Sequence, residues 1–79
     1  MAQSEVLREA SERGDSAGVE FALRHGADLD AADLGSGMSA LHYAAWHGRK
    51  NVVDQLITAR AAVNTKCHSG LSPLLMAAW

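Results

Sequence analysis

The sequence predicts an all-α protein built from stacked helical pairs, and three observations carry this prediction. A ten-residue phrase occurs twice, as GMSALHYAAW at 37–46 and as GLSPLLMAAW at 70–79, at a spacing of 33 residues. Apolar residues recur at helical spacing between these phrases, and glycines separate the helical stretches. Self-similarity with a period of about 20 to 50 residues is the signature of a stacked repeat array.

A weaker copy of the pattern precedes the other two. Its matching positions lie 34 residues before their counterparts, in the pairs Leu7/Leu41, Ala10/Ala44, Gly14/Gly48, Val19/Val53 and Leu23/Ile57. The change from 34 to 33 falls between Asp30 and Gly37, in a connector where an added residue costs little. We therefore divide the chain into a degenerate first repeat at 1–33, a complete repeat at 34–66 and the start of a third at 67–79.

Local rules predict the elements within one period. Ser39 and Ser72 read as helix N-caps, and Ser72 is followed by a proline at the first helical position. Gly48 should end a short first helix, and a second helix should cover about residues 51–59, where apolar side chains have helical spacing. The turn-rich segments between pairs predict hairpin-like fingers.

This order of elements resembles the ankyrin repeat. The best copies are GMSALHYAAWHG, followed by ARAAVN, and GLSPLLMAAW. The resemblance implies an ankyrin-repeat solenoid of about two and a half repeats, with paired antiparallel helices and projecting fingers. Three positions depart from the pattern, and one of them is Leu75, which replaces the motif histidine in the third copy. Cys67 replaces the turn aspartate that Asp33 keeps, and Arg60 replaces a glycine that ends a helix, where positive φ would cost about 1 kcal/mol.

The resemblance also implies a function, that of a non-enzymatic adaptor that binds a protein partner on its concave helix face and finger loops. Trp46 and Trp79 occupy equivalent positions at first-helix ends, where large aromatics could anchor a partner. The alternative for both tryptophans is packing between repeats. We expect no cofactor and no metal, and the candidate partner-binding residues are Leu34, Met38, Trp46, His47, His68, Ser69, Leu71 and Trp79.

The histidines could suggest chemistry instead. In the ankyrin motif the residue equivalent to His42 bonds a Ser or Thr hydroxyl and loop backbone, so we expect His42 to bond Ser39 and to serve as scaffold. His42 and His47 lie about 140° apart around a helix, which prevents them from sharing a metal. The competing interpretation is a small thiol- or metal-dependent site around Cys67 and His68, although no second Cys/His cluster accompanies them.

Composition excludes several other classes of protein. The net charge is −2 and the seven basic residues are scattered, which disfavours nucleic-acid binding. No apolar run approaches the roughly 18 residues of a membrane helix. One cysteine permits no intrachain disulfide and fits a reducing compartment, so we expect an intracellular protein of the cytoplasm or nucleus.

The third repeat lacks a second helix, so Leu56 and Ile57 of the second repeat should lose much of their cover. Three explanations are open. The favoured one is that the chain is a segment of a longer ankyrin array. The chain could instead associate with another copy or another protein through its uncapped C-terminal edge, or it could be only partly folded alone.

Overall fold

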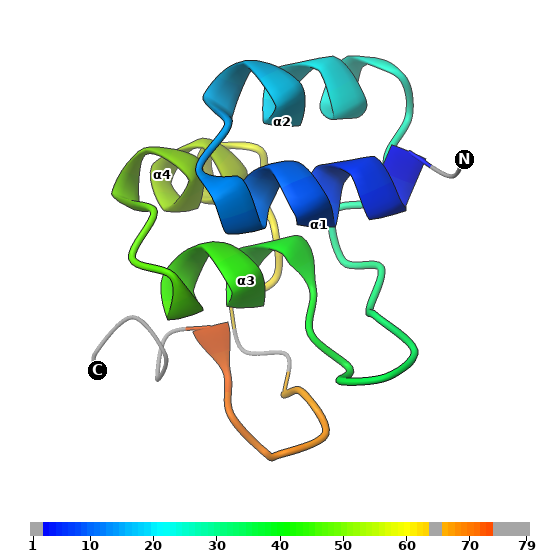
Figure 1. Ribbon diagram of the computed structural model, residues 1–79, viewed down its shortest axis with the longest axis vertical. Coiled ribbons are helices and arrows are strands. Elements are labelled where there is room, and N and C mark those ends of the chain that lie inside the picture. Colours follow the sequence, from blue (N-terminus) through cyan, green and yellow to red (C-terminus); the bar gives the residue numbers. More distant parts are fainter. Residues whose placement is uncertain (1–2, 64–65, 74–79) are drawn as a thin grey trace.

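The computed structural model describes residues 3–63 and 66–73 of the 79-residue chain. In this part of the chain the regular elements are α-helices, and no strand occurs (Figure 1). The helices are α1 (Gln3–Arg13), α2 (Ser16–Arg24), α3 (Ala40–Trp46) and α4 (Lys50–Thr58). The all-α prediction is therefore confirmed, and the expected second helix of the complete repeat is displaced by one residue at each end.

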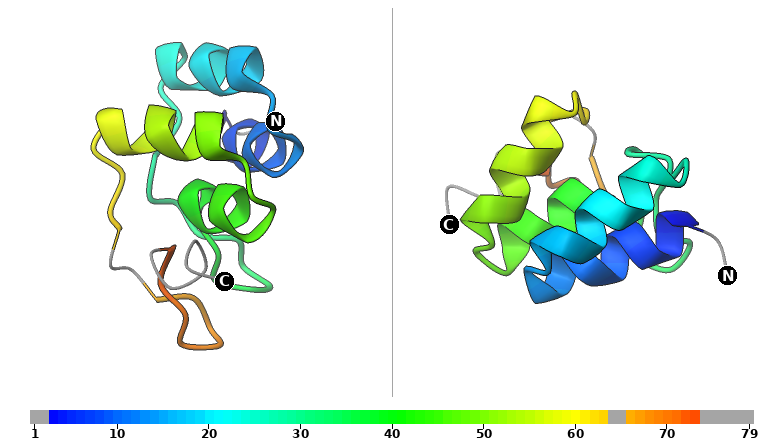
Figure 2. Two further views of the ribbon diagram at one scale, coloured as in Figure 1. Left: turned by 90° about the vertical axis from the view of Figure 1, so that its left-hand side faces the viewer. Right: turned by 90° about the horizontal axis from the view of Figure 1, so that it is seen from above.

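The four helices form two antiparallel pairs that stack in the same orientation. α1 packs on α2 and α3 packs on α4 within the pairs, while α1 lies beside α3 and α2 beside α4 between them (Figure 2). One layer therefore consists of the first helices, α1 and α3, and the other of the second helices, α2 and α4. This is the repeat solenoid that the 34-residue spacing predicts.

The core lies between the two layers. Its largest apolar side chains, Leu7, Val19, Leu41, Val52 and Leu56, are almost completely buried, and alanines from three of the helices fill the spaces between them. Removing this apolar surface from water is the main stabilising contribution. The prediction that Leu56 loses its cover is wrong, because its side chain lies inside the cluster that both pairs form. Its neighbour Ile57 is 48% exposed.

The helix ends follow the local rules. Ser39 is the N-cap of α3 and forms a capping box with His42. In the first pair, Gly26 follows α2 with a φ of 84°, and the equivalent position after α4 is Arg60, with a φ of 74°. Among the described residues Arg60 is the one non-glycine residue with positive φ. The predicted strain at this position, about 1 kcal/mol, is therefore present.

Two turns project from the array at equivalent points, the first finger (residues 33–38) and the second finger (residues 67–71) (Figure 1). The Asp33 amide donates to the Met38 carbonyl at 2.9 Å, and the Cys67 amide donates to the Leu71 carbonyl at 2.9 Å. Four residues separate the first pair and three separate the second. The predicted insertion therefore lies inside the turn of the first finger.

Candidate partner-binding groove

The first finger is held against α3 by Tyr43. The Tyr43 hydroxyl donates to Asp33 Oδ2 at 2.6 Å and lies 3.3 Å from the Ser36 hydroxyl. The other Asp33 oxygen accepts the Gly35 amide at 2.9 Å. One carboxylate therefore organises its own turn and also fixes the position of an aromatic side chain on the neighbouring helix.

The pKa values of this pair have shifted in opposite directions. The pKa of Asp33 is lowered, first by the hydrogen bond from Tyr43 and then by the Gly35 amide, while desolvation opposes the shift. The pKa of Tyr43 is raised, first by burial and then by its bond to Asp33. At neutral pH a protonated phenol therefore donates to an ionised carboxylate, which gives a charge-assisted hydrogen bond.

The second finger is held by His42, which is fully buried. The imidazole Nδ1 accepts the Ser39 amide at 3.1 Å and lies 2.8 Å from the Ser39 hydroxyl, which donates to it. Nε2 lies 3.0 Å from the Leu71 carbonyl, so this nitrogen carries the proton and donates. The scaffold role predicted for His42 is confirmed, since Nδ1 bonds Ser39, the N-cap residue of α3, and Nε2 bonds the second finger.

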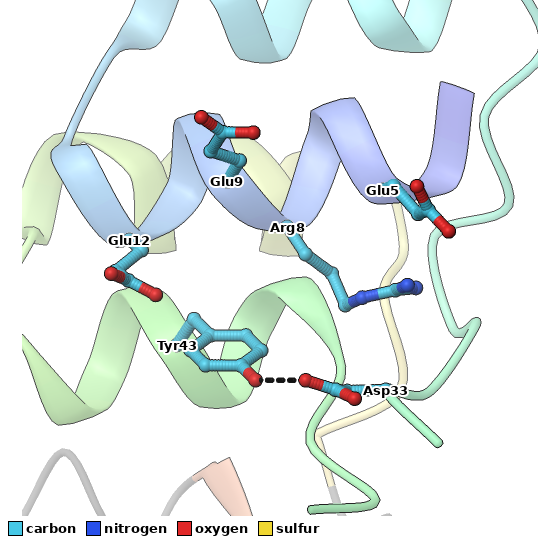
Figure 3. Close-up of a pocket in the computed structure, with 6 residues that line it drawn as sticks. All are labelled: Glu5, Arg8, Glu9, Glu12, Asp33 and Tyr43. Carbon is cyan, nitrogen blue, oxygen red and sulfur yellow. Dashed lines mark hydrogen bonds between the residues drawn. The ribbon is translucent and has the colours of Figure 1, made fainter. Parts of the chain in front are cut away.

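A hollow of about 290 Å³, which we call the groove, opens between the first helices and the first finger (Figure 3). In Figure 3 the Glu12 and Arg8 side chains extend from α1 toward α3, with Glu12 close to the Tyr43 ring and Arg8 close to Asp33. The groove lies on the layer of first helices, the layer that the resemblance assigns to partners. Its lining residues are Glu5, Arg8, Glu9 and Glu12 of α1, Asp33 of the first finger and Tyr43 of α3.

The residues of α1 that line the groove are not among the candidates predicted from the sequence. The 34-residue offset places Glu9 at the position of Tyr43 and Glu12 at the position of Trp46. Equivalent positions on neighbouring repeats lie side by side, so the offset alone could have predicted that these carboxylates flank the aromatic residues. The similarity between the first two repeats is clear at their apolar positions, whereas Glu9 and Glu12 differ in kind from Tyr43 and Trp46.

Five of the predicted partner-binding residues lie at the surface. Leu34 is 97% exposed in the first finger, and Trp46 is 51% exposed at the end of α3, with His47 exposed beside it. His68 and Ser69 are exposed in the second finger. Trp46 follows Tyr43 by three residues on α3, and the two side chains are therefore about 60° apart around the helix axis. Both aromatic residues belong to one face of α3.

The other three predicted residues differ from these. Met38 and Leu71, the last residues of the two fingers, are partly buried and pack on Ala45 and Cys67 in a small second cluster at the base of the fingers. Their role in the structure is to support the fingers, and contact with a partner stays a prediction. Trp79 lies outside the described residues, and so does the predicted pairing of its ring with that of Trp46.

His68 also contributes to the contact between the fingers. Its amide donates to the Ser36 carbonyl at 3.0 Å, and its ring lies over Gly37. A Cβ atom at Gly37 would lie 2.5 Å from His68 Cδ2, so the ring occupies the space that a side chain would need. Gly37 also has a φ of 72°, which L-residues rarely adopt. The two fingers thus interlock.

Cys67 and His68, the candidates for thiol or metal chemistry, lie in different surroundings. Cys67 is buried and its sulfur lies 3.1 Å from the Ser69 hydroxyl. This hydrogen bond lowers the pKa of the Cys67 thiol, against the effect of burial. The His68 ring lies against Gly37 of the first finger and not beside the Cys67 thiol. In the described part of the chain, no group of three or more His, Cys, Asp or Glu side chains is placed to hold a metal ion.

The arrangement defines a helical-repeat protein with an open groove, and comparison with known proteins identifies its family. The family model for ankyrin repeats in three copies matches residues 7–79. The chain belongs to the ankyrin-repeat family, whose repeats are generally protein–protein interaction modules. Among the described residues, no helix has the length and apolar character needed to cross a bilayer.

Two curated relatives show similarity over most of the chain. The ankyrin repeat protein nuc-2 of Neurospora crassa is 34% identical over 70 residues, and the B-cell lymphoma 3 protein homolog of Mus musculus is 38% identical over 69 residues. Each match covers 87% of this chain, but only 6% and 15% of the respective relatives. The chain therefore corresponds to a small part of the proteins that it resembles.

Proposed function

We propose that this chain binds a segment of a partner protein along the groove and the two fingers, without enzymatic activity. The observation that carries the proposal is the half-exposed Trp46 at the end of α3, on the same face as Tyr43. A tryptophan that remains half in water gains free energy when a partner covers it, and such residues dominate the affinity of many interfaces. The ankyrin family supports a binding role in general terms.

The fingers supply the remainder of the proposed interface. Leu34 presents an apolar side chain that is 97% exposed in the first finger, and further polar groups are exposed in His47 at the end of α3 and in His68 and Ser69 of the second finger. An apolar centre with a polar rim is the usual composition of a specific interface. Met38 and Leu71 belong to this proposal as the packed base of the fingers, and Trp79 as a further anchor at the position equivalent to Trp46.

The expected affinity is modest. A groove formed by two helical pairs and two fingers is short, so a partner should bury less than the roughly 1,600 Å² of a standard interface. We expect binding in the micromolar range, where a few anchoring contacts decide the outcome. Further repeats would lengthen the groove and strengthen binding.

A second candidate function is self-association through the exposed side of α4. Ile57 is 48% exposed, and a hollow of about 320 Å³ lies nearby, lined by Ala45, Gly48, Lys50, Val53 and Asp54. Apolar surface of this kind could bind a second copy. Sedimentation velocity over a hundredfold concentration range decides the question, because self-association would raise the sedimentation coefficient with concentration and a constant monomer value would exclude it.

Affinity capture with two matched variants tests the main proposal. Trp46→Ala and Phe21→Ala each remove an aromatic side chain that is about half exposed, 51% for Trp46 and 54% for Phe21. Phe21 lies on α2 and stacks on His25 at 4.1 Å, in the other layer of helices. The immobilised wild-type chain and both variants are incubated with cell extract, and retained proteins are identified by mass spectrometry.

We expect proteins retained by the wild-type chain to be retained by Phe21→Ala and lost with Trp46→Ala, at unchanged helical circular dichroism. Equal retention by both variants would contradict the proposal. A collapse of the helical signal in Trp46→Ala would instead assign Trp46 to the core.

A further inference from the structure

We infer that the segment bound in the groove is basic, and that it places a lysine or arginine side chain over Tyr43 between the carboxylates of α1 and the first finger. This inference rests on the proposed function and specifies the chemistry of the partner. Three observations support it. They are the negative charge of the groove, the hydrogen bonds and ion pairs that its charged side chains form within the protein, and the aromatic ring of Tyr43 beside these side chains.

The groove carries a strong excess of negative charge. Four of its six lining residues are acidic and one, Arg8, is basic. The Arg8 guanidinium donates to the Ala31 carbonyl at 3.2 Å and forms no ion pair with a lining carboxylate. Arg8, the one basic residue in the lining, is therefore engaged by a backbone carbonyl. It attracts the lining carboxylates only through longer-range electrostatics.

The carboxylates differ in what they already bond. Glu9 pairs with Arg13 at 2.6 Å, and Asp33 accepts Tyr43 and Gly35. The carboxylates of Glu5 and Glu12 have no hydrogen bond or ion pair with another described residue. These two side chains lie at opposite ends of the groove in Figure 3, so a bound cation can reach a carboxylate at either end.

The shape of the groove suits one long side chain. Its volume of about 290 Å³ is at the lower end of the roughly 300–1,000 Å³ of small-molecule sites. Its floor includes the Tyr43 ring, which the bond to Asp33 holds in place, and the Glu12 side chain lies next to this ring (Figure 3). An aromatic ring beside a carboxylate favours a cation, while the apolar stem of lysine or arginine packs on the ring.

Charge complementarity also excludes other occupants of the groove. An acidic segment would bring like charges together at low dielectric, which costs affinity. A wholly apolar segment would cover Trp46 and Leu34 but would leave Glu5 and Glu12 desolvated without partners. A basic segment that also carries apolar residues satisfies both parts of the surface, the carboxylates near Tyr43 and the apolar groups at Trp46 and Leu34.

Peptide selection followed by binding measurements tests this inference. Random 12-residue peptides displayed on phage are selected on the immobilised chain, and the enriched sequences are synthesised with a fluorescein label. We expect enrichment of lysine and arginine, and an affinity by fluorescence anisotropy that falls about tenfold between 25 and 300 mM NaCl. Enriched peptides that are neutral or acidic and lose binding to Trp46→Ala would overturn the inference and leave the proposed function in place.

Two double variants with the same net charge locate the effect. Glu5→Gln with Glu12→Gln removes the two unpaired carboxylates of the groove, and Glu20→Gln with Asp54→Asn removes two exposed carboxylates from α2 and α4. Both change the formal net charge from −2 to zero. We expect the groove variant to weaken binding of the basic peptide about fivefold and the control to leave it unchanged.

Equal weakening by both double variants would overturn the inference, because binding would then depend on net charge and not on the groove. Selection that enriches no peptide dependent on Trp46 would overturn both the inference and the proposed function. These outcomes separate the proposed function from the inference. The Trp46 variant tests which surface binds the partner, and the carboxylate variants test whether the partner is basic.

Discussion

His42 and Tyr43 are adjacent in the chain, yet they secure different fingers. His42 extends from α3 to the Leu71 carbonyl of the second finger, whereas Tyr43 extends to the Asp33 carboxylate of the first finger. Adjacent residues on a helix point about 100° apart, which allows one short helix to hold a turn on either side. The positions of both fingers therefore depend on two side chains of one helical turn.

Asp33→Asn should lower the free energy of unfolding at pH 7. It should also make this free energy decrease less when the pH is lowered. The pKa of Asp33 in the folded chain lies below its ordinary value of 3.8, so folding favours the ionised form. That stabilisation is present above about pH 4 and is lost as pH falls through the folded pKa. The difference between wild type and variant, measured by urea unfolding, should be largest at pH 7 and smallest near pH 2.

Asp54→Asn removes the same charge from the exposed side of α4 and serves as the control for this comparison. A wild-type to Asp33→Asn difference that stays constant from pH 7 to pH 2 would contradict the account, since neutral loss of packing would then explain the effect.

At the scale of elements, the two fingers act as one unit. The first finger is one residue longer than the second and exposes Leu34, and its Gly37 accommodates the His68 ring of the second finger. The His68 amide bonds the Ser36 carbonyl across the same contact. A change in one finger should therefore be transmitted to the other.

Gly37→Ala should destabilise the chain by about 1–2 kcal/mol, because a side chain there is strained at a φ of 72° and meets the His68 ring. Gly35→Ala is the matched control in the same finger. A Cβ atom at Gly35 would lie 3.5 Å from Asp33 Oδ1, an ordinary contact, so its effect should stay within about 0.5 kcal/mol. Urea unfolding monitored by circular dichroism measures both, and equal effects would contradict the interlocked arrangement.

The elements themselves could be predicted from the sequence because they depend on local rules. Ser39 caps α3 as its position before the helix predicts, and Gly48 follows the same helix with a φ of 68°. The burial of Leu56 could not be predicted, because repeat counting shows how many neighbours a helix has but not toward which neighbour a side chain points. The small cluster around Met38 and Leu71 depends on how the fingers fold back, which the spacing alone does not specify.

At the scale of the whole molecule, the stack of two pairs creates a surface that neither pair has alone. The groove combines α1 carboxylates from the first pair with Tyr43 from the second and Asp33 from the finger between them. The sequence led, through the repeated AAW phrase, to Trp46, which shares a face of α3 with Tyr43 but is not among the residues that line the groove, and it did not lead to Tyr43 itself. It did not lead to the carboxylates of α1 either, because the first repeat is degenerate and Glu5, Glu9 and Glu12 match no motif.

Amide chemical-shift mapping identifies the face of the molecule that receives the partner. The ¹⁵N-labelled chain is titrated with the tightest labelled peptide from the selection, and shifts are followed residue by residue. If the peptide binds in the groove, we expect the largest changes in α1, α3 and residues 33–38 and 67–71, together with the Trp46 indole, while α2 changes little. Shifts concentrated in α2 and α4, with Trp46 unaffected at saturation, would contradict binding in the groove.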